Sequence, residues 1–234
     1  MGTLVAYRLE DSIATITMDD GRVNALSPAM LSELGGALDR AEADQAVVVL
    51  TGRDQTFSAG FDLGVLKGGG QEAVAMIRAG FELAARILAF PRPVVIACNG
   101  HAIAMGVFLL LSADYRVGTA GSHKITANEV AIGLTMPLPA IEICRQRIAP
   151  AHFTRAVLLA EVYSPDDAVD AGFLDRVVPA AELRDSARGV AAELAKLDMD
   201  AHAASKLRAR DQALRAIRAS IESEAATLAE RAHG

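Results

Sequence analysis

The chain has 234 residues, 52% of them hydrophobic, so it is long and apolar enough to bury a substantial core. Its 29 acidic and 23 basic residues are interspersed and give a net charge of -6, which leaves no basic stripe for a phosphate backbone and argues against nucleic acid as a partner. The first residues lack a signal-peptide pattern and no apolar run approaches membrane-spanning length, so we expect a cytoplasmic protein without a membrane partner. Cys98 and Cys144 have the spacing of neither a metal knuckle nor a redox pair, so we expect no bound metal.

The first half of the chain alternates strand and helix patterns. Two β-like runs, 4–9 and 13–18, flank a predicted hairpin turn, and Ser27 before Pro28 is typical of a helix N-cap. The other elements expected in this half are strands at 46–50, 94–98 and 114–117 and helices over 71–90 and 104–112. The last of these helices is apolar on every side, which favours a buried position.

After Gly133 the pattern is helical, and we expect no further strands. The predicted helices cover 137–148, 150–160, 165–170, 180–197 and 201–231. Alternating strands and helices followed by a helical tail predict an α/β fold, and no linker is long enough to separate independent domains. We expect the helical tail to cover a partner subunit.

Two glycine-bearing turns indicate what chemistry the protein could perform. The stretch TFSAGFDLG, residues 56–64, follows an apolar run, and NGHAIAMG, residues 99–106, lies between a buried strand and a buried helix. The first N–H groups of a helix have no partner inside the helix and carry partial positive charge, so such a turn can receive an oxygen that becomes negative. Two turns of this kind can share one oxyanion.

With these segments the sequence resembles the crotonase superfamily, the enoyl-CoA hydratase/isomerase family. The resemblance rests on TFSAGFDL, PVVIACNGHAIAMG, SADYRVG, NEVAIGL and YSPDDAVDAGFLDRVV, which follow one another in the family's order. It implies a crotonase-like spiral of repeated ββα units that contains the acyl-CoA site over residues 1–180. It also implies a helical C-terminal region over 181–234 for oligomerisation and pocket cover, and a homotrimer, or a hexamer made of two trimers.

The resemblance further implies a coenzyme A thioester whose carbonyl oxygen lies between the main-chain N–H groups of Phe61 and Met105. Coenzyme A is then part of the substrate, and no tightly bound cofactor is expected. The residues expected to contact it are Ser58, Ala59, Phe61, Asp62, Leu63 and Lys67, with Asp62 also capping the following turn. Met105 and Phe108 are expected to line the acyl pocket.

Glu129 is the expected base. It matches the second of the two glutamates that hydratases of the family use, whereas the position of the first holds Phe108. One base can move a double bond from the 3 to the 2 position, because it removes a proton from C2 and returns it to C4. Isomerases of the family look similar, so the resemblance favours 3,2-enoyl-CoA isomerisation. Hydration of a 2-enoyl-CoA in fatty-acid β-oxidation and non-catalytic acyl-CoA binding are the alternatives.

Other candidate residues have structural explanations. We expect His101 to be a hydrogen-bonding spacer in its turn and Glu142 to form a surface salt bridge, although either could serve the chemistry. The cysteines are expected to be small buried hydrophobes. The cations that could meet the phosphates of coenzyme A are Arg53, Lys67 and Arg92, of which Lys67 lies soonest after the first turn.

Overall fold

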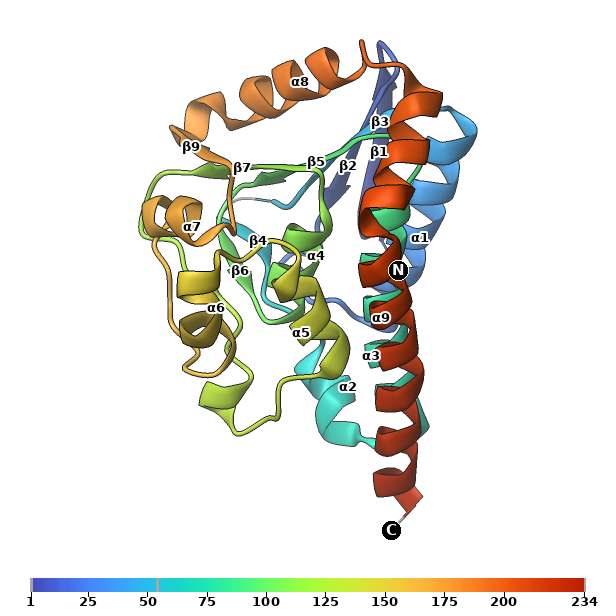
Figure 1. Ribbon diagram of the computed structural model, residues 1–234, viewed down its shortest axis with the longest axis vertical. Coiled ribbons are helices and arrows are strands. Elements are labelled where there is room, and N and C mark those ends of the chain that lie inside the picture. Colours follow the sequence, from blue (N-terminus) through green and yellow to red (C-terminus); the bar gives the residue numbers. More distant parts are fainter. Residues whose placement is uncertain (1, 54, 234) are drawn as a thin grey trace.

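The computed structural model describes residues 2–53 and 55–233, with side chains described as far as residue 227. The described residues form two sheets (Figure 1). The large sheet has the order β1 (Val5–Glu10), β2 (Ile13–Met18), β3 (Val47–Thr51), β5 (Val94–Cys98), β7 (Tyr115–Thr119) and β9 (Arg176–Val178). The small sheet has the order β4 (Thr56–Ser58), β6 (His101–Ile103) and β8 (Ile125–Thr126). All the pairings are parallel except that of β1 with β2.

The chain repeats one path: a strand of the large sheet, a strand of the small sheet, then a helix. After β3 and β4 come α2 (Leu63–Gly68) and α3 (Gly70–Ala89), after β5 and β6 comes α4 (Met105–Ser112), and after β7 and β8 comes α5 (Leu138–Arg145). The predicted α/β fold with a spiral of ββα units and a helical C-terminal region is therefore confirmed.

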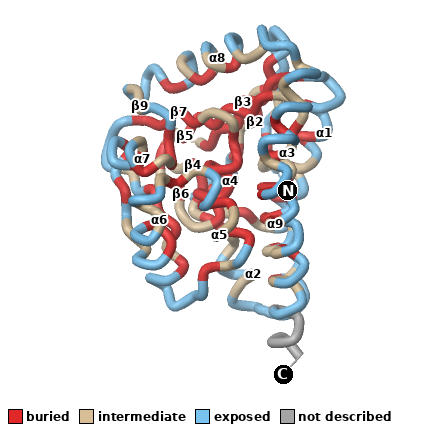
Figure 2. The backbone as a smooth tube through the Cα atoms, in the orientation of Figure 1, coloured by how far each residue is buried: buried red, intermediate tan, exposed pale blue. Residues whose placement is uncertain are grey.

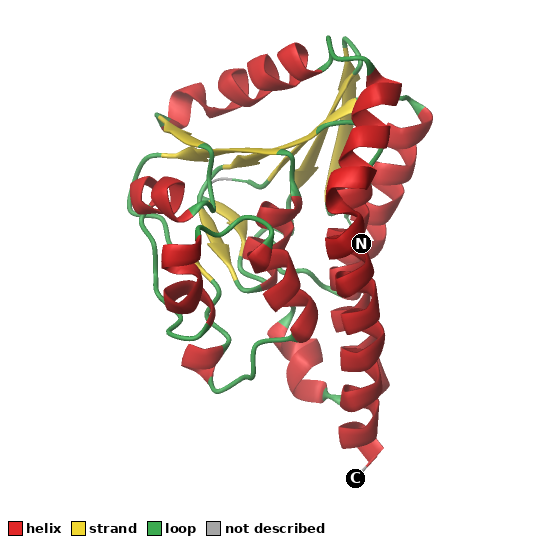
Figure 3. Ribbon diagram, in the orientation of Figure 1, coloured by secondary structure: helices red, strands yellow, loops and turns green. Residues whose placement is uncertain are grey.

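The large sheet separates two hydrophobic cores. On one face α8 (Leu183–Leu194) packs its Leu183, Ala187 and Ala191 against β3, β5 and β7. The other face, with the small sheet, meets α1 (Pro28–Ala43), α3 and α4, and Figure 3 shows α8 on the opposite side from these helices. Every residue of α4 is buried (Figure 2), as its uniformly apolar sequence predicts.

The final helix, α9 (Met199–His233), runs along α3 and also contacts α5 (Figure 1). The expected helical tail is present, and in this chain its buried face lies on the same subunit. Its buried residues there are Ala213, Leu214, Ile217 and Ile221.

Two expectations about the elements were wrong or incomplete. A strand does follow Gly133, since β9 pairs with β7, but it has only three residues at the sheet edge and lies between helices. The small sheet was not predicted because its strands have two or three residues each, too few for an alternating pattern. The remaining helices are α6 (Pro150–Val157), α7 (Pro165–Ala171) and the 3-10 turns Val130–Ile132 and Ala180–Glu182.

No helix in the described part of the chain is long and apolar enough to cross a bilayer.

A buried charge cluster fastens α9 to the large sheet. One carboxylate oxygen of Asp114 accepts a hydrogen bond from Val94 N–H at 2.7 Å and lies 2.6 Å from Lys206 Nζ, and the other lies 3.0 Å from Arg210. The Lys206 side chain is 3% exposed, and burial lowers the pKa of Lys206 to about 8 although Asp114 opposes the shift. Removing the carboxylate would leave two cations against the sheet without their counter-charge.

We predict that Asp114→Asn lowers the free energy of unfolding by about 3 kcal/mol, because it leaves a buried ammonium group unpaired. Urea denaturation at a fixed protein concentration measures this loss. The matched control is Asp211→Asn on the same helix, which removes an exposed ion pair with Arg215 and should change the free energy by about 0.5 kcal/mol or less. Equal, small losses in the two variants would contradict this account of the cluster.

Candidate active site

The small sheet brings three loops to one edge. Within it, β6 pairs in parallel with β4 on one side and with β8 on the other. Because the carboxyl ends of parallel strands meet at the same edge, the segments that follow them are neighbours. Phe61 follows β4, Met105 follows β6 and Glu129 follows β8, each within three residues of the strand end.

Two glycines let the first two loops approach closely. A Cβ atom added to Gly60 would lie 2.9 Å from the Ala104 Cβ and 3.3 Å from the Met105 nitrogen. One added to Gly106 would lie 2.5 Å from the Ser58 carbonyl oxygen. Real Cβ atoms essentially never come as close to another atom as 2.9 or 2.5 Å, so the main chains around Phe61 and Met105 are held together at a distance that only glycine allows.

The main-chain N–H groups of these two residues are unpaired within the part of the chain that the structure describes. Among the hydrogen bonds between described residues, none has the N–H of Phe61 or Met105 as its donor. Met105 is the first residue of α4, so its N–H lies at the positive end of the helix dipole. Ala104 before it has φ +51°, a conformation that costs an alanine about 1–3 kcal/mol and marks a constrained turn.

The first turn is held by the segment that precedes α1. Leu26 N–H donates to Gly60 O at 2.8 Å, and Ala59 N–H donates to Val23 O at 3.0 Å. The buried Ser58 hydroxyl donates to Asn24 O and accepts from Gly60 N–H. The Ser58 side chain therefore supports the turn, although it was expected to contact coenzyme A.

Glu129 is a buried carboxylic acid that forms no ion pair with another residue in the described ranges. Its residue is 6% exposed, and its Oε2 atom has no hydrogen-bond partner among the described residues. Burial raises the pKa of Glu129 to about 7, although a hydrogen bond from its own main-chain N–H acts in the opposite direction. A carboxyl group with a pKa near neutrality can both take up and release a proton.

Aromatic rings fill the space beside the two turns. The Phe61 ring meets Phe81 of α3 edge to face with centroids 6.2 Å apart, and Phe81 stacks on Phe108 at 6.0 Å. Gly80 makes room for this arrangement, because a Cβ atom there would lie 2.4 Å from the Phe61 ring. Phe108 lies one helical turn after Met105, so the expected pocket-lining residue is next to the second turn.

The residues after the first turn are more exposed. Asp62 caps α2, as expected, by accepting hydrogen bonds from Gly64 and Val65 N–H. Leu63 is 60% exposed, and Lys67 is exposed in the last turn of α2. Their contact with coenzyme A stays a prediction.

The other polar candidates have partners in the fold. His101 Nδ1 accepts a hydrogen bond from Lys124 N–H, and Glu142 lies 3.6 Å from Arg145, so both have the structural contacts expected of them. Arg53 forms an ion pair with Asp19, and the carbonyl oxygen of Arg92 accepts a hydrogen bond from Lys206. Both cysteines are buried, as predicted.

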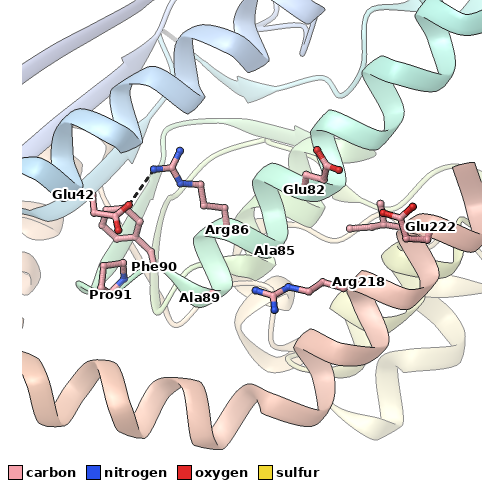
Figure 4. Close-up of a pocket in the computed structure, with 10 residues that line it drawn as sticks. Glu42, Glu82, Ala85, Arg86, Ala89, Phe90, Pro91, Arg218 and Glu222 are labelled. Carbon is pink, nitrogen blue, oxygen red and sulfur yellow. Dashed lines mark hydrogen bonds and ion pairs between the residues drawn. The ribbon is translucent and has the colours of Figure 1, made fainter.

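A hollow in the protein surface is lined by other residues than those of the two turns (Figure 4). It has a volume of about 420 Å³ and is lined by residues of α1, α3 and α9. Its charged side chains include Arg86, which pairs with Glu42, and Glu82 and Glu222, which both pair with Arg78 outside the hollow. These ion pairs tie three helices together, and none of the predicted site residues lines the hollow.

Sequence reasoning missed two neighbours of the site. Gly80 interrupts a helical pattern, and a glycine in a helix interior is a signal for a close contact that could have been used. Cys144 of α5 is the other neighbour. Burial raises the pKa of its thiol, and Glu129 is close enough for its charge to raise that pKa further. No sequence pattern links Cys144 to Glu129, because they meet only through the packing of α5.

Comparison with known proteins places the chain among acyl-CoA enzymes. The family model described as "Enoyl-CoA hydratase/isomerase" matches residues 8–233. A probable enoyl-CoA hydratase from Rhodobacter capsulatus is 31% identical over 86% of this chain and 79% of its own. Two solved structures are still more similar. An enoyl-CoA hydratase/isomerase family protein from Pseudomonas syringae has 44% identity, a TM-score of 0.95 and coverage of 96% of this chain and 98% of its own. An enoyl-CoA isomerase from Mycobacterium tuberculosis has 48% identity, a TM-score of 0.93 and coverage of 97% and 99%.

The raised pKa of Glu129 makes stability depend on pH. Below the ordinary value of 4.5 the carboxyl is protonated in both the folded and the unfolded chain. As pH rises to about 7 the unfolded chain releases this proton first, so the folded state loses up to about 3 kcal/mol by pH 8. We predict that Glu129→Gln, which carries no charge, is more stable than the parent protein at pH 8 and differs little at pH 4.5.

Thermal unfolding at the two pH values measures this difference. The control is Glu142→Gln, which removes the ion-paired carboxylate on α5 and is not expected to stabilise the protein at pH 8. If Glu129→Gln were no more stable than the parent at pH 8, Glu129 would not be a desolvated carboxylate.

Proposed function

The chain belongs to the enoyl-CoA hydratase/isomerase family, and from this premise we propose that it converts 3-enoyl-CoA thioesters into 2-enoyl-CoA thioesters. The family makes it an enzyme that acts on coenzyme A thioesters. One observation carries the choice of isomerisation. The sheet edge carries two main-chain N–H groups and the buried carboxyl of Glu129, none of which has a hydrogen-bonding or charged partner on another described side chain or main chain, and position 108 holds a phenylalanine.

The N–H groups of Phe61 and Met105 are proposed to bind the thioester oxygen. When a proton leaves C2, negative charge moves onto that oxygen, so fixed donors stabilise the transition state more than the ground state. Removing one such donor typically costs about 10²–10³ in rate. The proposal fits the unused N–H groups of both turns and the glycines that hold the turns together.

Glu129 is proposed to move the proton. Its carboxylate takes a proton from C2 of the 3-enoyl chain, and the electron pair of the broken C–H bond delocalises into a dienolate. The neutral acid then returns the proton to C4, so the double bond lies between C2 and C3 and Glu129 is again a carboxylate. A pKa near 7 suits both steps, since neither form of the group is strongly disfavoured.

Hydration of 2-enoyl-CoA is the second candidate, and one observation favours it. Thr126 Oγ1 and Asn128 Oδ1 are buried and, like Glu129 Oε2, have no hydrogen-bond partner among the described residues. Thr126 is the last residue of β8, and Asn128 and Glu129 follow within three residues of it. Buried polar groups of this kind commonly hold a water molecule. A water bound there would be a nucleophile for a double bond next to the thioester.

Further parts of the proposal concern coenzyme A and assembly. We propose that Ala59, Asp62 and Leu63 contact coenzyme A next to the first turn. Ser58 contributes by holding that turn in place, and the exposed Lys67 binds a phosphate of coenzyme A. We also propose that the protein is a cytoplasmic trimer or hexamer. In this proposal residues 1–180 form the spiral core, and residues 181–234 serve oligomerisation and cover the pocket.

We predict that the protein isomerises 3-hexenoyl-CoA and hydrates crotonyl-CoA only slowly. Glu129→Gln should lower kcat for isomerisation by about 10²–10⁴, because it removes the base, and should bind acyl-CoA as well as the parent protein. Glu142→Gln is the matched control and should keep the activity of the parent. Faster hydration of crotonyl-CoA than isomerisation of 3-hexenoyl-CoA would reverse the ranking, and binding of both thioesters without turnover would indicate a carrier.

We also predict that kcat/KM for isomerisation rises with pH and levels off above about 7, because the free enzyme must hold Glu129 as a carboxylate. A pH series from 5 to 9 with 3-hexenoyl-CoA measures this dependence. The residual activity of Glu129→Gln should lack the same inflection. An inflection that persists in the variant would assign the titration to another group.

A further inference from the structure

An acyl chain bound at the two turns must pass the side chains that surround them. With the thioester oxygen at the N–H groups of Phe61 and Met105, the part of the chain beyond C4 passes the side chains next to those turns. These are the rings of Phe61, Phe81 and Phe108, which we call the aromatic cluster. The aromatic cluster therefore lies where it can limit the length of the acyl chain.

The aromatic cluster is tightly packed. Phe81 and Phe108 are each 1% exposed, and their rings stack with an angle of 30°. On the other side the Phe61 ring lies against Gly80 so closely that no side chain fits at that position. A packed core of this kind does not open for extra methylene groups without a cost.

A small void lies next to Phe81. It has a volume of about 10 Å³ and is lined by Ile77 and Phe81 of α3, Pro139 of α5 and Ile221 of α9, among others. This is room for no more than one water molecule. Phe81 therefore belongs both to the aromatic cluster and to the wall of this void, which Arg78 and Glu224 also line and which has no space for a chain while the ring is present.

We propose that the aromatic cluster closes the acyl end of the site, so that the enzyme prefers short 3-enoyl chains, and that Phe81 is the residue that sets this limit. The inference rests on the proposed function, since it uses the same thioester position. Replacing the Phe81 ring with a methyl group joins the site to the void and makes room for a longer chain. Phe81 is then a specificity-determining residue rather than a catalytic one.

The test compares kcat/KM for 3-hexenoyl-CoA and 3-dodecenoyl-CoA in the parent protein and in Phe81→Ala. We expect the parent to favour the shorter substrate by about tenfold or more, and Phe81→Ala to raise the ratio of long to short by at least about tenfold. Phe81→Leu, which keeps more of the volume, should fold if Phe81→Ala does not and should shift the ratio in the same direction. The proposal is overturned if the parent uses both chains equally well, or if neither folded variant shifts the ratio.

A matched control separates specificity from a general loss of packing. Phe90 at the end of α3 is also 1% exposed but lies outside the aromatic cluster, so Phe90→Ala should leave the ratio unchanged. Binding of hexanoyl-CoA and dodecanoyl-CoA, measured by calorimetry, gives a readout that needs no turnover. If binding shows a chain-length preference that depends on Phe81 but no isomerisation occurs, the pocket is supported and the proposed reaction is rejected. If isomerisation occurs without that preference, the reaction is supported and the role of Phe81 is rejected.

Discussion

The close approach of two main-chain turns is the constraint on which the proposed site depends. Gly60 and Gly106 face the opposite turn at distances that no Cβ atom tolerates, so the small sheet can bring the ends of β4 and β6 together. The hydrogen bonds from Leu26 and Ala59 fix the first turn against the segment before α1. This packing leaves the N–H groups of Phe61 and Met105 without acceptors among the described residues. Unpaired donors of this kind cost free energy unless an oxyanion binds to them.

Among the described residues, the third strand of the small sheet adds an unpaired acceptor, the carboxyl group of Glu129, to the two unpaired N–H donors. Glu129 is buried after β8 and has no ion pair with another described residue, which lowers stability at neutral pH and raises the affinity of the group for a proton. The contrast with Asp114 is informative. That carboxylate is also shielded from water, but Lys206 and Arg210 pair with it, so it fastens α9 to the sheet and is not available for proton transfer.

Much of this organisation could be predicted from the sequence. The apolar runs of β3 and β5, the all-apolar α4 and the helix signals at Ser27 and Pro28 are local, and they appear in the structure close to their predicted bounds. The strands of the small sheet are not local in this sense. They have two or three residues each and exist because the turns pack together, so only the resemblance to a family indicated Phe61, Met105 and Glu129 in advance. The roles of Gly80 and Phe81 depend on how α3 meets the first turn, which no pattern in α3 alone reveals.

The most direct test of the central claim is a crystal structure of Glu129→Gln with bound 3-hexenoyl-CoA, in which the missing base preserves the substrate. The account predicts the thioester oxygen at about 3 Å from the main-chain nitrogens of both Phe61 and Met105, with C2 and C4 within reach of the side chain at position 129. A thioester oxygen bound to other groups, or a side chain at position 129 directed away from the acyl chain, would contradict it.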